Sequence, residues 1–392
     1  MSRKTFDEVV LNARTGLNPR NNFKLGNGDN KYITIKNIHN NEIIIDENTD
    51  VVDDDAIELI HKRSQIKKGD ILFCSIGRMG DMYIIQDEPK GWDINESVFA
   101  FTVDTNIVRQ KYFYYVFKNH DTIEYLSKNS SGSTFKSIKM NQLKKMVFDL
   151  PSLGEQDRIV DILDTMSLII KNREDELKRH DELVKARFVE LFGDPETNSL
   201  GWSEACIGDN CFVTKLAGFE YTKYITYADS GDVVMVKAQN VKNGSLNRKD
   251  LSFISNEVSD SLPRSQLAPG DVVMTYVGAN IGDVAIIDNE YKYHLAPNVA
   301  KIRPDADKYN SEFFMYMLMM KTDYIMRNSA DTAKAALGME RIRKLKVFVP
   351  DLLLQNQFAD FVKQVDKSKV AVQKALDETQ MLFDSLMQEF FG

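Results

Sequence analysis

The chain has 392 residues and an ordinary globular composition, with 43% hydrophobic and 28% charged residues. This length predicts two or three domains, each with its own core. No run of about 18 apolar residues occurs, and Met1–Phe6 lacks the apolar core of a signal peptide. Three cysteines and five scattered histidines argue against a disulfide framework and a closed zinc site. We therefore expect a cytoplasmic protein with no metal site and no membrane partner.

The net charge of −8 is unevenly distributed along the chain. Residues 151–193 and 350–392 together carry a net charge of −6. The other two blocks, residues 1–150 and 194–349, together carry only −2. A polyanionic partner is therefore not excluded for the blocks, although it requires a local basic face. The acidic segments suit protein docking better than contact with DNA.

In the first block, residues 1–150, the sequence predicts β-structure followed by a helix. A strand is expected at 32–38, and 68–85 reads as two strands joined by a glycine-bracketed turn. The aromatic run at 112–117 is typical of the buried face of a helix. Residues in the first strand and at the turn are candidates for reading bases, because amide and guanidinium groups can pair with base edges. They are Lys36, Asn37, Ser75 and Arg78.

The loop at 130–139 is rich in small residues and leads to a short amphipathic turn at 140–145 and a strand at 146–150. Serine, glycine and threonine let backbone N–H groups approach phosphates, and lysines add charge. A solvated loop is the equal alternative for any one residue. The candidates here are Ser133, Thr134, Lys136 and Lys139.

Two segments of equal length, residues 151–193 and 350–392, repeat at a constant offset of 199. Each begins with an apolar residue and proline, has a glutamine five residues later, and ends with Phe-Gly. Apolar residues at steps of three and four predict an amphipathic helix of about 35 residues, roughly 50 Å long. Such a helix needs a partner, and the other copy is the simplest one. The residues expected to pair the helices are Ile159, Leu163, Met166, Ile170, Leu177, Val184, Phe358, Val362, Val365, Val372, Leu376 and Phe383.

The second block, residues 194–349, starts with a polar, turn-rich boundary at 194–202 and repeats the first in outline. A strand at 233–241 matches 32–38, and 269–287 matches the two-stranded unit at 68–85. The same chemistry makes strand-end, turn and loop residues DNA-binding candidates, with a solvated helix face as the alternative for the arginines. They are Lys237, Gln239, Asn240, Tyr276, Asn280, Lys334, Arg341 and Arg343.

The repeats define the expected architecture: an α+β protein built from a duplicated unit of roughly 200 residues. Two globular domains, 1–150 and 194–349, are each followed by a long helix, 151–193 and 350–392. We expect the helices to pack as an antiparallel coiled coil that separates the domains with pseudo-two-fold symmetry.

The succession Gly-Ser-Thr…Val-Phe-x-Leu-Pro-x-Leu-x-Glu-Gln-x-x-Ile-Val from Gly132 onward, followed by a long helix and Leu-Phe-Gly-Asp-Pro, resembles the DNA-specificity subunit of type I restriction–modification enzymes. The resemblance covers nearly the whole chain and identifies the globular blocks with target-recognition domains. The second copy departs from it, with Leu354 where Glu155 stands and Asp-Thr-Ala at 331–333 where Gly-Ser-Thr stands at 132–134. These departures argue against identical contacts by the two loops.

The resemblance implies a function and a set of partners. The chain is expected to read a bipartite target in double-stranded DNA, with two different half-sites and a fixed gap, and to dock methyltransferase subunits, two in number, and a restriction or translocase subunit. AdoMet, ATP and Mg²⁺ are expected in those partners, with no cofactor in this chain.

The sequence shows no catalytic centre. No P-loop, no Asn-Pro-Pro-Tyr signature and no nucleotide-binding glycine loop occur, and Pro89 interrupts the one stretch that superficially suits a nuclease. Three alternatives remain open. They are the specificity subunit of a related enzyme that fuses restriction and methylation, a coiled-coil scaffold whose blocks bind protein, and a stand-alone nuclease.

Overall fold

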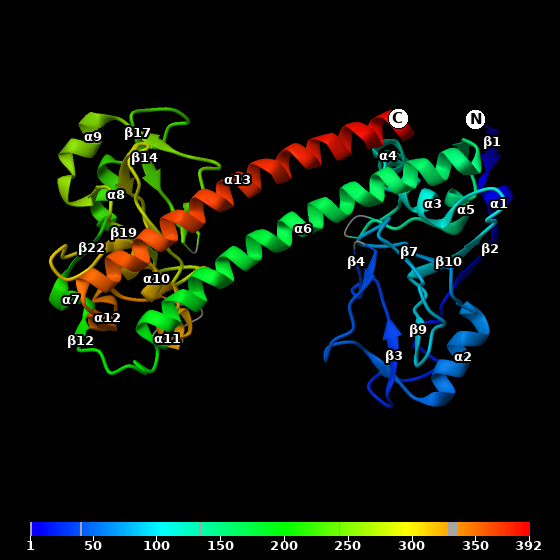
Figure 1. Ribbon diagram of the computed structural model, residues 1–392, viewed down its shortest axis with the longest axis horizontal. Helices are drawn as coiled ribbons and strands as arrows, with labels where there is room; N and C mark the ends of the chain where they lie inside the picture. Colours follow the sequence, from blue (N-terminus) through cyan, green and yellow to red (C-terminus); the bar gives the residue numbers. More distant parts are fainter. Residues whose placement is uncertain (1, 40, 133–134, 243, 328–335) are drawn as a thin grey trace. The chain divides into compact units, whose positions relative to one another are not determined.

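The computed structural model describes residues 2–39, 41–132, 135–242, 244–327 and 336–392 (Figure 1). The chain forms two compact units. Unit 1 comprises Met1–Glu174 and Ala375–Gly392, and unit 2 comprises Asp175–Lys374. No helix among the described residues is long and apolar enough to cross a membrane.

Each unit combines short strands with short helices and parts of two long helices. In unit 1 the chain order is β1 Ser2–Thr5, α1 Phe6–Val9, β2 Val10–Thr15, β3 Asn30–Ile33, β4 Ile38–His39, β5 Glu42–Ile43, β6 Val51–Val52, α2 Asp54–Ser64, β7 Ile71–Cys74, β8 Met82–Ile84, β9 Trp92–Ile94, β10 Val98–Val103, α3 Gln110–Val116, α4 His120–Asn129, α5 Met140–Leu143 and β11 Val147–Leu150. The long helices are α6 Leu153–Phe192 and α13 Leu352–Phe391.

Unit 2 follows a similar order after the first long helix, with the additional elements α8, η1, η2 and β18. Its elements are β12 Glu204–Cys206, α7 Ile207–Asn210, β13 Cys211–Lys215, α8 Gly218–Tyr224, β14 Val233–Val236, the 3₁₀-helix η1 Ala238–Asn240, β15 Val241–Lys242, β16 Ser245–Leu246, β17 Phe253–Ile254, α9 Asn256–Ser261, η2 Pro263–Ser265, β18 Gln266–Leu267, β19 Val272–Thr275, β20 Val284–Ile286, β21 Lys292–Leu295, β22 Val299–Pro304, α10 Ser311–Met319, α11 Thr322–Arg327, α12 Met339–Lys344 and β23 Lys346–Phe348.

An antiparallel four-stranded sheet lies at the centre of each unit, in the order β2-β10-β7-β8 in unit 1 and β13-β22-β19-β20 in unit 2. Both faces of this sheet are covered. Ile71 and Phe73 of β7 point into the core shared with α3 and the long helices, whereas Leu72 and Cys74 point into a second core with Ile33. Successive side chains of a strand point to opposite faces, so a run such as Ile71–Cys74 is apolar throughout. The predicted two-stranded units at 68–85 and 269–287 are β7–β8 and β19–β20.

The second sheet of each unit is mixed, in the order β6-β3-β9 in unit 1 and β17-β14-β21-β18 in unit 2. Here the predicted strand at 32–38 is wrong in extent, because the chain turns after Ile33 and starts the short strand β4 only at Ile38. The Asn37 side chain holds that turn by accepting from the Thr34 N–H at 2.9 Å. The predicted strand at 233–241 is divided in the same way by η1.

Both long helices begin with a side-chain N-cap. The Ser152 hydroxyl accepts from the Glu155 N–H, and the Asp351 carboxylate accepts from the Leu353 N–H at 2.7 Å, so both are N-caps. Each helix has 40 residues, slightly more than the 35 expected. Gly193, with a φ of 76°, follows the last turn of α6 in the left-handed conformation that glycine adopts readily.

A buried glutamine then fixes each helix to its own domain. The Gln156 side chain accepts from the Arg109 N–H at 2.8 Å and donates to the carbonyls of Ile107 and Pro151 at 3.0 and 3.1 Å. Gln355 makes the equivalent three bonds with Asn310, Lys308 and Pro350 at 2.9 Å each. These bonds explain why the glutamine recurs five residues after each proline.

Inside each unit the start of one long helix packs beside the end of the other, so the pairing is antiparallel (Figure 1). In unit 1, Ile159 and Leu163 share a core with Phe383, and Arg173 donates to the Ala375 carbonyl and the Thr379 hydroxyl. In unit 2 the shared core contains Val184, Phe358, Val362 and Val365. The other residues expected to pair the helices are only half-buried. They are Met166, Ile170, Leu177, Val372 and Leu376.

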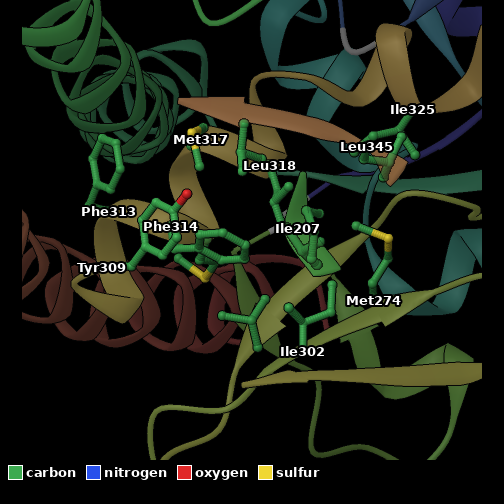
Figure 2. Packing of buried hydrophobic residues seen from close by; sticks show 14 of the residues in the cluster. Ile207, Met274, Ile302, Tyr309, Phe313, Phe314, Met317, Leu318, Ile325 and Leu345 are labelled. Carbon is green, nitrogen blue, oxygen red and sulfur yellow. The ribbon is translucent and has the colours of Figure 1, made fainter. Parts of the chain in front are cut away.

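In unit 2 the globular domain and the long helices share one hydrophobic core. Figure 2 shows Phe314 and Leu318 of α10 in the same core cluster as Met274 of β19 and Ile302 of β22, with Phe313 on the side of the long helices. Phe188 of α6 stacks on Phe313 with ring centroids 5.6 Å apart, and the Phe192 ring packs against Phe313 in a tilted orientation at 4.6 Å. The compact units therefore cut across the long helices, whereas the sequence divides the chain at 150, 193 and 349.

Candidate DNA-binding surface

Three loops of unit 1 meet at the β7–β8 turn. The Arg78 guanidinium, on this turn, donates to the carbonyls of Ile35 and Lys36, both at 2.9 Å. On the other side, the Gly77 N–H donates to the Lys136 carbonyl at 3.2 Å. Lys36, Arg78 and Lys136 are all exposed, so the structure brings together three cations that the sequence places about 40 and 60 residues apart.

An acidic residue lies in the middle of this basic group. One oxygen of Asp81 is 3.2 Å from the Lys118 ammonium, and the other is 3.4 Å from His39 Nδ1 and 3.9 Å from Arg78 Nε. Arg78 and Lys118 together outnumber the single carboxylate, so the surface keeps a positive charge that suits phosphate. The sequence gives no sign of His39 or Lys118 at this place, because both arrive there only through the fold.

Two candidates in unit 1 are not surface residues, and their prediction as DNA-contacting residues is corrected. Besides accepting from Thr34, the Asn37 amide donates to the Ile44 carbonyl at 3.0 Å, and only 8% of the residue is exposed. The Ser75 hydroxyl is buried and donates to the Ser97 carbonyl at 2.8 Å. Both side chains satisfy buried backbone groups and cannot reach a base. Lys139 stays exposed at the start of α5.

Unit 2 has an equivalent backbone arrangement around its own turn. The β19–β20 turn adjoins the segment before α12, where the Leu337 N–H donates to the Tyr276 carbonyl at 2.9 Å. Gln239 and Asn280 are exposed at the places that correspond to Lys36 and the β7–β8 turn. The position of Asp81 is taken by Asp283, and burial raises the pKa of that carboxyl while Lys242 opposes the shift. The two units therefore present different side chains from one framework.

Three further candidates in unit 2 make contacts within the domain. Asn240 is 2% exposed and donates to the carbonyls of Asn247 and Lys249, as Asn37 does in its own turn. Tyr276 is 9% exposed and its ring belongs to the core, with the Lys215 ammonium 5.3 Å from the ring centroid. Asn240 and Tyr276 are therefore corrected to structural residues. The Lys237 ammonium is half-buried and donates to the Asp250 carbonyl and the Ser252 hydroxyl.

The basic helix α12 contributes two arginines, Arg341 and Arg343. Arg341 is exposed. Arg343 pairs with Glu340 at 2.6 Å and donates to the Val213 carbonyl at 3.0 Å, so it fastens α12 to β13. The candidates Ser133, Thr134 and Lys334 lie outside the described residues.

The helix α8 of unit 2 is a feature that sequence reasoning missed. Phe219 is 70% exposed on it, and the Lys223 ammonium lies 4.9 Å from the centroid of the Tyr224 ring. It follows β13 directly, next to the Lys215–Tyr276 contact. Exposed aromatic rings beside lysines could have signalled a nucleic-acid surface, since bases stack on such rings. In unit 1 the segment after β2 has no helix.

The family model for the type I restriction modification DNA specificity domain matches the chain twice, over residues 6–179 and 200–379. The chain belongs to this family. The first match lies in unit 1 apart from residues 175–179, and the second lies in unit 2 apart from residues 375–379. The chain is a DNA-sequence-recognising subunit of a type I restriction–modification system.

Curated relatives are distant in sequence but similar in extent. The specificity subunit of the type I restriction enzyme EcoBI from Escherichia coli is 20% identical over 76% of this chain and 68% of its own length. The MjaIX specificity subunit from Methanocaldococcus jannaschii is 22% identical over 93% of this chain and 87% of its own.

Solved structures share the α+β fold with two specificity domains. The S subunit of a type I restriction–modification system from M. genitalium aligns over 100% of this chain and 96% of its own, at 15% identity and a TM-score of 0.56. A chain from a study of complex assembly and conformational transition in the type I R-M system aligns over 100% and 97%, at 16% identity and a TM-score of 0.57.

Proposed function

We propose that the two units read two different half-sites of a bipartite target separated by a fixed gap, and that this chain carries out no catalysis itself. The observation that supports this most directly is the pair of equivalent turns. The backbone hydrogen bonds around the β7–β8 and β19–β20 turns match, yet Lys36 and Arg78 stand on one and Gln239 and Asn280 on the other.

The difference in chemistry implies a difference in bases. Arginine and lysine pair best with the guanine major-groove edge, whereas glutamine and asparagine pair best with adenine. The cations around Asp81 add phosphate contacts that position unit 1 without reading sequence. Unit 1 therefore suits a half-site that contains guanine, and unit 2 suits one that contains adenine. The long helices set the distance between the two.

The same proposal assigns the chemistry to partners. Two methyltransferase subunits and a restriction or translocase subunit would dock on this chain, and AdoMet, ATP and Mg²⁺ would belong to them. The complex would act on double-stranded DNA in the cytoplasm. The acidic outer faces of α6 and α13 suit protein docking, because they would repel the phosphate backbone.

The test is to purify the chain with the methyltransferase subunit of its own restriction–modification system and to map methylated adenines on genomic DNA. We expect one two-part motif with a constant gap. Replacing residues 1–150 with the equivalent block of another family member should then change one half of the motif and leave the other half and the gap unchanged. Methylation without a two-part motif, or a swap that alters both halves, would contradict the proposal.

A further inference from the structure

The helix α8 leaves the central sheet of unit 2 at the same edge as the β19–β20 turn. Both β13 and β19 pair antiparallel with β22, which lies between them, so they run in the same direction and end at the same edge. Lys215, the last residue of β13, is opposite Ala300 of β22, and Met274 of β19 is opposite that residue on the other side. Two strand spacings, about 10 Å, therefore separate Lys215 from Met274.

The chain just before β22 lies between these two segments. The Asn298 carbonyl accepts from the Tyr276 N–H at 3.0 Å, and the Asn298 residue is exposed. Across β22, the Lys215 ammonium lies 5.3 Å from the centroid of the Tyr276 ring. Lys215 and Asn298 thus continue the candidate DNA-binding surface of the turn, which carries Asn280, to the start of α8.

Contacts with the domain hold α8 in one orientation. The Glu220 carboxylate accepts from the Ala217 N–H at 2.9 Å at the start of the helix and pairs with Arg264 at 3.2 Å. Tyr221 and Ile225 are half-buried and pack against the core of the neighbouring mixed sheet. Glu220 is the only acid in the sequence of α8, and its charge is therefore already balanced within the domain.

The outward face of α8 combines an aromatic ring with a positive charge. Phe219 is 70% exposed, and Lys223 follows it by four residues, which places the two side chains on one face of the helix. In unit 1 the segment after β2 also contains one phenylalanine, but the Phe23 ring packs on Tyr32 with ring centroids 5.5 Å apart. Phe23 stabilises its own domain, whereas Phe219 points to solvent beside cations. This charge favours a polyanion as the occupant.

We propose that α8 is a second DNA-contacting element of unit 2, in which the Phe219 ring enters a base step beside the bases read by the β19–β20 turn. Lys215 and Lys223 would contact phosphates on either side of that step. Apolar side chains that enter a step partly unstack it and kink the duplex. That unit 2 faces a half-site of its own rests on the proposed function.

The wedge gives unit 2 a form of selectivity that unit 1 lacks. Pyrimidine–purine steps such as TA and CA are the easiest to unstack, so the step that meets Phe219 should be of this kind. Unit 2 would then select its half-site in two ways, by contacts of Gln239 and Asn280 with base edges and by the cost of deforming the adjacent step.

The test uses the assembled methyltransferase and a duplex that carries the motif mapped for the parent chain. The fluorescent base 2-aminopurine is placed in turn at positions in and beside the half-site of unit 2, apart from the methylated adenine. We expect one step to become brighter on binding, because unstacking relieves quenching. Phe219→Ala should abolish this signal and weaken binding at least about fivefold. Phe219→Leu should keep the signal, since leucine is also a wedge.

Two further variants separate the ring from the charge. Lys223→Gln should keep the signal but lower the slope of log Kobs against log salt concentration by about one, because one phosphate contact is lost. Phe212→Ala is the matched control. Phe212 is 52% exposed at the other end of β13, with the Lys301 ammonium 5.4 Å from its ring centroid, and its removal should change neither signal nor affinity.

Equal binding and equal signal in the parent and Phe219→Ala would overturn α8 as a DNA-contacting element. Weaker binding by Phe219→Ala with no brighter step in the parent would overturn the wedge. A Phe219→Ala chain that loses the methyltransferase subunit during purification would assign α8 to protein docking instead. Failure of the half-site proposal would appear earlier, in the methylation motif of the parent chain, before any variant is compared.

Discussion

At the scale of single residues, neighbours on the same turn have opposite tasks. Asn37 and Asn240 are buried and hold their turns through equivalent hydrogen bonds, whereas the residues before them, Lys36 and Gln239, point to solvent. The sequence could identify the region but not which of the neighbouring residues is buried. All four side chains are polar, and the turn in which they lie interrupts the strand pattern. Long-range contacts such as that of Arg78 with Ile35 are equally invisible in a local pattern.

Removal of the exposed turn side chains should weaken DNA binding at one half-site each. We expect Arg78→Ala to lower affinity for the half-site read by unit 1 by about 1–3 kcal/mol, and Asn280→Ala to do so for the other half-site. Binding of oligonucleotides with one altered half-site, measured for the assembled methyltransferase at a fixed salt concentration, separates the two. Lys62→Ala, at an exposed position on α2, is the control. Equal losses at both half-sites in either variant would contradict the assignment.

His294 predicts an acid sensitivity of unit 2. This residue of β21 is fully buried beside the carbonyls of Leu295 and Leu262, and burial lowers its pKa below the usual 6.5, with Lys301 adding to the shift and Glu220 opposing it. The unfolded chain takes up a proton at His294 near pH 6.5, whereas the folded chain takes it up only at a lower pH. The free energy of unfolding should therefore fall as the pH drops below 6.5, by up to about 1.4 kcal/mol per pH unit.

Trp202, the only tryptophan of unit 2, reports its unfolding in a Trp92→Phe background. Urea titrations between pH 5 and pH 8 should show the loss in the parent and a smaller one in His294→Gln. The exposed His120→Gln serves as the control. An unchanged pH dependence in His294→Gln would show that another group is responsible.

At the scale of elements, the helices and the central strands follow from local patterns. Period-three-and-four apolar residues predicted α6 and α13, and apolar runs beside glycine predicted β7–β8 and β19–β20. The pairing of β1 with β11 could not be predicted, because it joins Ser2–Thr5 to residues near 150. The short helix α8 was also missed, since its exposed Phe219 and Tyr224 leave no buried face to produce a periodic pattern.

The buried glutamines should be among the most sensitive positions outside the apolar cores. Gln156→Ala leaves the Arg109 N–H and the carbonyls of Ile107 and Pro151 without partners, and each unsatisfied buried group costs about 1–3 kcal/mol. We expect a loss of at least about 2 kcal/mol in the unfolding free energy of unit 1, and the same in unit 2 for Gln355→Ala. Urea titrations followed by Trp92 and Trp202 measure the two separately. Gln357→Ala, at an exposed position of α13, should be close to neutral, and similar losses in all three variants would exclude the hydrogen bonds as the cause.

At the scale of the whole molecule, the duplication is the feature of the fold that supports the proposed two-part target. Similar backbones with different turn residues recur about 200 residues apart, and two helices of 40 residues connect them. The sequence showed this repeat plainly because the offset between the helical segments is constant. Each unit, however, includes parts of both long helices, and no pattern within either repeat indicates this.

Insertion of one heptad into the middle of each long helix should lengthen the gap and leave the bases unchanged. Seven helical residues add about 10 Å, which corresponds to about three base pairs of DNA. Methylated-adenine mapping with the assembled enzyme should show both half-sites intact with a longer gap. Altered half-sites with the original gap would mean that the helices do not set the distance.

The division of unit 1 between the two ends of the chain also determines when it can be completed during synthesis. Unit 2 is continuous, so all its residues are present before Ala375 is made. Unit 1 has to wait about 200 residues after Glu174 for the segment that covers Ile159 and Leu163. At 5–20 residues per second this delay is roughly 10–40 s. The first domain to leave the ribosome is thus the last to close its core, and its apolar helix face stays open to other proteins throughout that interval.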